Sequence, residues 1–88
     1  MLIIHRKKRE QIKITHSSKD VEYNLEISNY NPLLRTAHIL INNDTVSMSM
    51  NDDTFVKEID DMLLILYSVD RGVKIGIKAS KEWRIERL

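Results

Sequence analysis

Residues Val73–Leu88 read VKIGIKASKEWRIERL, and this stretch decides the fold. Hydrophobic residues alternate with lysine or glycine as far as Lys78, and after a turn at Ala79-Ser80 they alternate with charged residues. A period of two predicts a β-strand with one apolar face and one polar face. We therefore expect two strands here, and both carry basic residues on the outward face.

The same alternation recurs along the rest of the chain. Strands are predicted at residues 1–4, 11–14, 21–27, 37–41, 46–50 and 63–69. Turns rich in charged, asparagine, serine, glycine or proline residues are predicted at 5–9, 15–20, 28–32, 42–44 and 70–72. The continuous apolar run at 63–69 is typical of a central strand.

One short helix is predicted at residues 54–62. The preceding Asn51-Asp52-Asp53-Thr54 offers several side chains that could cap a helix N-terminus. Phe55, Ile59 and Met62 follow at spacings of four and three, which would place them on one helical face. The expected fold is therefore mostly β with one short helix.

Charge is distributed unevenly along the chain. The net charge is +1, yet residues 1–14 carry a balance of +4, residues 15–62 a balance of −6, and residues 63–88 a balance of +3. If the two ends meet in the fold, they form one positive surface of the kind that binds nucleic acid. The alternative is a set of solvated charged faces without a partner.

Composition excludes several classes of protein. The 88 residues suit one domain, and without cysteine there is no disulfide framework or thiolate zinc site. No apolar run reaches the ~20 residues that span a bilayer, so we expect a cytoplasmic protein without a membrane segment. The histidines are scattered and no nucleophile stands beside a base, so we expect no metal, no cofactor and no catalytic residues.

The two basic ends, MLIIHRKKRE at 1–10 and VKIGIKASKE at 73–82, together resemble the carbon storage regulator (CsrA/RsmA) family of bacterial post-transcriptional regulators. Its members open with Met-Leu-Ile-Leu-x-Arg-Arg-x-Gly-Glu. Later they carry Val-Arg-Ile-Gly-Val-x-Ala-Pro-Lys-Glu before a strand with a key arginine. That arginine falls on Arg87 here. The resemblance covers about 40 of the 88 residues, in two blocks at opposite ends.

The resemblance implies an interleaved, strand-swapped β-sheet homodimer. In such a dimer the first strand of one subunit lies beside the last strand of the other and forms an RNA site. The expected ligand is a GGA element in an mRNA leader hairpin, where binding represses translation, and a regulatory small RNA is a further partner. The RNA-binding residues carried over are Ile4, His5, Arg6, Lys7, Arg84, Ile85 and Arg87.

The chain departs from the family pattern at several positions. Arg9 replaces a glycine, Tyr67-Ser68-Val69-Asp70 replaces a glycine-containing turn, and Ser80 replaces a proline. Residues 15–62 have no counterpart for most of their length, which predicts a single domain with this segment inserted between the second strand and the central strands. Some divergent members insert a helix at this place.

The roles of the segment 15–62 and of Trp83 each allow two interpretations. The acidic segment 15–62 could bind another protein, which would make the chain an interaction module or an antagonist that sequesters a related regulator. Trp83 could stack on a base, although packing at the dimer seam is the simpler expectation. An enzyme is the least supported class.

Overall fold

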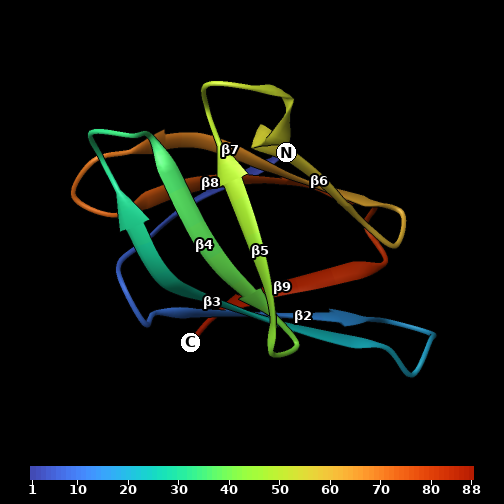
Figure 1. Ribbon diagram of the computed structural model, residues 1–88. Helices are drawn as coiled ribbons and strands as arrows, with labels where there is room; N and C mark the ends of the chain where they lie inside the picture. Colours follow the sequence, from blue (N-terminus) through green and yellow to red (C-terminus); the bar gives the residue numbers. More distant parts are fainter.

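The computed structural model describes all residues 1–88 and contains nine strands and one turn of 3-10 helix (Figure 1). In chain order the elements are β1 (Leu2–Arg6), β2 (Gln11–His16), β3 (Glu22–Asn31), β4 (Thr36–Ile41), β5 (Asp44–Ser49), η1 (Asp53–Phe55), β6 (Val56–Ile59), β7 (Met62–Val69), β8 (Val73–Lys78) and β9 (Trp83–Arg87). The prediction of a mostly β protein is confirmed. No helix has the length and apolar character that crossing a membrane requires.

The strands form two antiparallel sheets that face each other (Figure 1). The four-stranded sheet has the order β1-β8-β7-β6, and the five-stranded sheet has the order β5-β4-β3-β2-β9. Residues 63–69 are central, as predicted, because β7 lies between β8 and β6. The two ends of the chain both occupy edges, with β1 at the edge of one sheet and β9 at the edge of the other.

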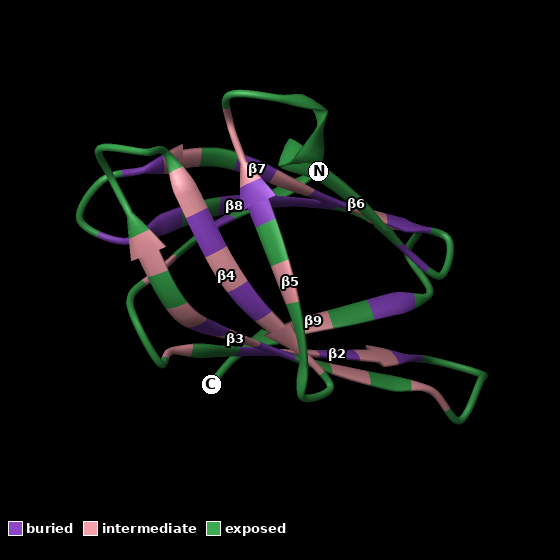
Figure 2. Cartoon of the chain, in the orientation of Figure 1, coloured by how far each residue is buried: buried purple, intermediate pink, exposed green.

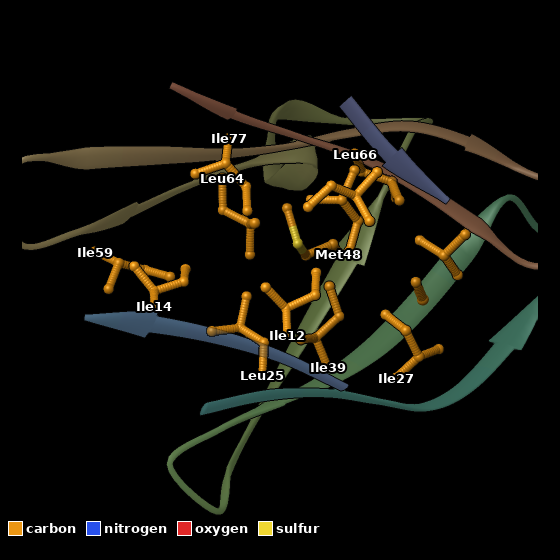
Figure 3. Close-up of a cluster of buried hydrophobic side chains, with 14 of the residues drawn as sticks. Ile12, Ile14, Leu25, Ile27, Ile39, Met48, Ile59, Leu64, Leu66 and Ile77 are labelled. Carbon is orange, nitrogen blue, oxygen red and sulfur yellow. The ribbon is translucent and has the colours of Figure 1, made fainter. Parts of the chain in front are cut away.

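The core lies between the sheets and contains 17 buried hydrophobic residues. Figure 3 shows Leu64, Leu66 and Ile77 of one sheet pointing toward Ile12, Leu25 and Ile39 of the other. Along β2 and most of β7 the buried positions alternate with less buried ones (Figure 2), as the period of two predicts. Burial of each such side chain contributes roughly 1.5–3 kcal/mol, and this term holds the two sheets together.

The helix predicted at 54–62 is wrong. Only Asp53–Phe55 forms one 3-10 turn, with the Asp52 carboxylate accepting from Thr54 N at 2.8 Å, and the chain then enters β6. Ile59 and Met62 are buried because they pair across the β6–β7 turn. A helix this short has a costly nucleus, whereas β6 gains a full ladder of hydrogen bonds with β7.

The turn predicted at 28–32 is also wrong, because β3 continues to Asn31. A β-bulge between Ile27 and Asn29 keeps the strand paired with β4 beyond that point. At the bulge Ser28 Oγ donates to the carbonyl of His38 at 2.9 Å, which gives the polar side chain a partner within the sheet. Two other turns are shorter than predicted, because β1 extends to Arg6 and β2 to His16.

The segment 15–62 supplies most of the five-stranded sheet, since β3, β4 and β5 all lie within it. Its hairpin around Asn42 and Asn43 is confirmed, with both residues at positive φ (49° and 72°). Within one chain β1 pairs with β8, and β9 pairs with β2. The interleaving of two chains stays a prediction.

Candidate nucleic-acid interface

The four first-strand candidates differ in how far they are available to a ligand. Ile4 is 1% exposed and belongs to the core, so that only its main chain could contact RNA. His5 points away from the core, opposite Lys74 of β8, and is exposed. Arg6 is half-buried at the end of β1, and Lys7 is exposed in the turn that follows.

The end of β1 is fixed by the turn between β7 and β8. Gly72 has a φ of 145° and packs against His5 and Arg6, where an added Cβ would lie 2.7 Å from His5 Nε2 and 2.9 Å from the Arg6 carbonyl. A side chain at this position would therefore be strained and would also collide with β1. Glycine allows the turn to support the strand that carries the candidate residues.

The last-strand candidates lie on β9, which pairs antiparallel with β2. Arg84 lies opposite Thr15 on the outward face, and its Nε is 3.6 Å from Oε1 of Glu86. Ile85 is half-buried and packs against the core. Arg87 is exposed at the end of the strand and forms no ion pair. Its guanidinium is free to bind an anion or to stack.

The structure brings the two basic ends of the chain together. Arg6 Nη1 donates to the carbonyl of Leu88 at 3.3 Å, and Leu88 N donates to the carbonyl of Gln11 at 3.1 Å. The C-terminus therefore lies beside the turn between β1 and β2 (Figure 1). We call this surface, formed by Arg6, Lys7, Lys8, Arg9 and Arg87, the basic corner.

One carboxylate organises the turn of the basic corner. Glu10 Oε1 accepts from Lys7 N at 2.7 Å, and Glu10 N donates back to the Lys7 carbonyl at 3.0 Å. The Lys7 hydrogen bond, together with the positive charges of Arg6 and Lys7, lowers the pKa of Glu10 below its ordinary value of 4.5. The charged glutamate thus shapes the turn, although sequence reasoning treated it only as part of a pattern.

A polar cavity beside the C-terminus was missed by the sequence reasoning. It has a volume of about 240 Å³ and opens on the outward side of the five-stranded sheet, lined by Gln11, Asn24, Leu25, Glu26, Leu40, Asn42 and Asn43. Gln11 Nε2 donates to Glu26 Oε1 at 2.8 Å, and Asn42 Oδ1 accepts from Asn24 N at 2.8 Å. The alternation of strands 11–14 and 21–27 places Gln11, Asn24 and Glu26 on the outward face, which was the available signal.

Trp83 is packed, as its apolar position suggested. It is 6% exposed, and its Nε1 donates to Asp61. The centroid of its ring lies 4.7 Å from the ring centroid of His16 and 5.9 Å from that of Tyr23. The buried ring cannot stack on a base in this arrangement. No group of three or more histidine or acidic side chains is placed to hold a metal ion.

Comparison of the chain with protein-family models, curated proteins and solved structures finds no match. The candidate site therefore stands on its own geometry. That geometry is a cluster of cations, all exposed except the half-buried Arg6, where two edge strands end, an arrangement suited to phosphate groups and to the edges of unpaired bases.

Proposed function

We propose that this protein is an RNA-binding post-transcriptional regulator that recognises GGA elements in mRNA leader hairpins and represses translation. The contact between Arg6 and Leu88 is the observation that supports it most, because it gathers the two basic ends into one corner. Single-stranded loop bases can be read by strand edges, while arginine and lysine hold the phosphates.

The candidate residues have different roles in this proposal, and Arg6 holds the Leu88 carbonyl beside the turn between β1 and β2. Arg87 makes the main base contact, because its guanidinium is exposed and unpaired. Lys7 and Arg84 bind phosphates, and His5 lies at the outer margin. Ile4 and Ile85 act through the main chain, since their side chains face the core.

The proposal includes an interleaved homodimer. Both terminal strands lie at sheet edges, and each is held by one neighbour only, β1 by β8 and β9 by β2. Two copies could exchange these strands and form the same pairs again, so the exchange would cost few contacts. Sedimentation velocity at several protein concentrations measures whether the dimer forms.

The decisive experiment is a fluorescence-anisotropy titration at one stated salt concentration. Wild-type protein is titrated with a hairpin that carries GGA in its loop and with a matched GCA hairpin. Arg87→Ala is expected to weaken GGA binding by about 1–3 kcal/mol. Arg35→Ala, which removes an exposed arginine from the β3–β4 turn, is the matched control and should bind as wild type does. Equal, weak binding of both hairpins by the wild type would refute sequence-specific recognition.

A second candidate function is favoured by one feature of the segment 15–62. Leu33 is 94% exposed and Leu34 59%, yet the turn that carries them is ordered. Asn31 Oδ1 accepts from both leucine N–H groups (3.0 and 3.2 Å), and Asn51 Nδ2 donates to the Leu34 carbonyl at 2.7 Å. Apolar side chains held in solvent in this way suit an antagonist that binds a related regulator.

The antagonist function has its own test. The chain is added to a carbon storage regulator protein already bound to a labelled GGA hairpin. Release of the hairpin by wild type, but not by Leu33→Ser, would favour the antagonist over the RNA-binding regulator. No release would exclude it.

A further inference from the structure

The outward-facing residues of the four-stranded sheet form rows of distinct chemical character, and these rows lie outside the basic corner. Its central row is apolar and runs across the four strands as Ile3, Gly76, Ile65 and Val56. One flanking row contains His5, Lys74 and Ser68, and the other contains Lys78, Leu63 and Glu58. Basic residues thus lie on both sides of an apolar row on β8.

A β-bulge places an aromatic ring in the middle of this face. The register of β7 against β8 shifts between Leu66 and Ser68, and Tyr67 is the extra residue. Its ring covers Gly76, where an added Cβ would collide with the ring carbon Cε2. Tyr67 OH also lies 3.5 Å from the sulfur of Met1, yet the side chain is 38% exposed. The ring therefore rests on the strand at Gly76 while part of it stays accessible to solvent.

The basic side chains around this ring form no ion pairs. Lys74 and Lys78 lie two residues before and after Gly76, roughly 6.6 Å along the strand in each direction. Both lysines are exposed, as is His5 beside Lys74, and none of the three forms an ion pair. Two carboxylates lie on the Lys78 side of this face. Glu58 is in the same row as Lys78, and Asp61 lines a pocket with Lys78 and accepts from the Trp83 indole at 2.7 Å.

We propose that this face, which we call the tyrosine face, binds a segment of single-stranded RNA, with a base stacked on Tyr67 and phosphates held by Lys74 and Lys78. An aromatic ring flanked by cations matches the alternation of base and phosphate along an unpaired strand. His5 belongs both to this face and to the candidate interface, so the two surfaces are continuous.

The inference rests on the proposed RNA-binding function and extends it. The basic corner would read the loop, and the tyrosine face would hold the unpaired nucleotides that flank the hairpin. An apolar protein partner is less suited to this surface, because it would bury Lys74 and Lys78 without a counter-charge. Stacking of this kind tolerates any base, so the tyrosine face adds affinity without adding sequence preference.

The test uses three RNAs with the full chain: the GGA hairpin alone, the hairpin with five unpaired nucleotides at its end, and the same hairpin with five abasic residues instead. We expect the unpaired extension to tighten wild-type binding and the abasic extension to tighten it less. Tyr67→Leu should lose roughly 5- to 150-fold in affinity for the extended hairpin. It should bind the bare hairpin as wild type does.

Two further variants separate stacking from charge and from folding. Tyr67→Phe keeps the ring over Gly76, so it should retain the gain from the extension. Lys74→Gln and Lys78→Gln change exposed side chains, and each should reduce the slope of log affinity against log salt by about 0.7. Far-UV circular dichroism confirms that the variants are folded.

The outcomes distinguish this inference from the proposed function. If Tyr67→Leu binds every RNA as wild type does, the tyrosine face is refuted while GGA recognition stands. If GGA and GCA hairpins bind alike but the extension still depends on Tyr67, the proposed recognition is refuted and the tyrosine face stands. Equal gain from abasic and normal extensions would mean that charge alone acts there, which overturns the stacking. Absence of binding to any of the RNAs refutes both.

Discussion

Trp83 Nε1 donates a hydrogen bond to Asp61 Oδ1 at 2.7 Å, and this contact ties the last strand of one sheet to the β6–β7 turn of the other. Beside it Tyr23 OH donates to Asp60 Oδ2 at 3.2 Å. Burial first, and then the negative charge of Asp60, raise the pKa of Tyr23 above 10, so its hydroxyl remains a donor at neutral pH. The turn that stands where a helix was predicted thus joins the two sheets at one end.

Removing the Asp61 carboxylate should destabilise the fold. Asp61→Ala leaves the largely buried indole N–H without its partner and is expected to lower the free energy of unfolding by about 1–2 kcal/mol. Asp61→Asn keeps an acceptor oxygen and should lose less. Urea unfolding followed by far-UV circular dichroism measures both. A double-mutant cycle with Trp83→Phe should give a coupling energy clearly different from zero. Additive losses would contradict a stabilising hydrogen bond between Trp83 and Asp61.

His16, whose ring packs against Trp83, has one defined tautomer. His16 is buried, and its Nδ1 accepts from the backbone N–H groups of Ser18 and Lys19 at 3.1 and 3.0 Å. The proton must therefore lie on Nε2, which is 2.9 Å from Glu82 Oε2 but is not aligned for a regular hydrogen bond. Long-range ¹H–¹⁵N correlation spectra should show Nδ1 as the unprotonated nitrogen, and a protonated Nδ1 would contradict this geometry.

Replacing this histidine tests what the two backbone contacts contribute. His16→Phe preserves a ring against Trp83 but leaves two N–H groups without their acceptor, so we expect a loss of about 1–3 kcal/mol in unfolding free energy. His38→Phe is the matched control. The ring of His38 is on an outward face and contacts Ser47 Oγ at 2.9 Å, so its replacement should cost less. Similar losses in the two variants would argue against the special role of His16.

Alternation in the sequence was sufficient to place most of the strands. Residues such as Ile12 and Ile14 face the core because the side-chain period of a strand is two whatever its partner is. The helix prediction at 54–62 was wrong because the spacings of Phe55, Ile59 and Met62 also fit a hairpin. In that hairpin Ile59 and Met62 face each other. Local pattern alone cannot separate these two solutions.

The candidate site was only partly accessible from the sequence. The contact between Arg6 and Leu88 joins residues 82 positions apart, and no periodicity reports on it. Charge and family resemblance suggested that the ends meet, but they did not show that the Ile4 side chain is buried. The position of Tyr67 depends on a bulge, and bulges shift register without a sequence signal of their own.

Acid should loosen the turn of the basic corner. The folded pKa of Glu10 is depressed, so its stabilising effect is fully present above the unfolded value near 4.5 and is lost as the pH falls through the lower folded value. An NMR titration of the Glu10 side-chain carboxyl carbon should give a midpoint below 4.5. In Glu10→Gln the stability curve should lack this dependence. A midpoint at or above 4.5 would show that the turn does not hold the charged form.

Arg9→Gly should make the protein more stable while it weakens RNA binding. Arg9 has a φ of 71°, a conformation that costs a residue with a Cβ about 1 kcal/mol more than glycine. The substitution should therefore raise the unfolding free energy by about 0.5–1 kcal/mol, which corresponds to a melting temperature higher by roughly 2–8 °C.

Lys8→Gly is the matched control. Lys8 has no positive φ, so its replacement should lower stability, because glycine gains freedom in the unfolded chain. Both variants remove one cation from the basic corner, so both should bind the GGA hairpin with a shallower salt dependence. A less stable Arg9→Gly protein would show that the arginine side chain contributes more to the turn than its backbone strain costs.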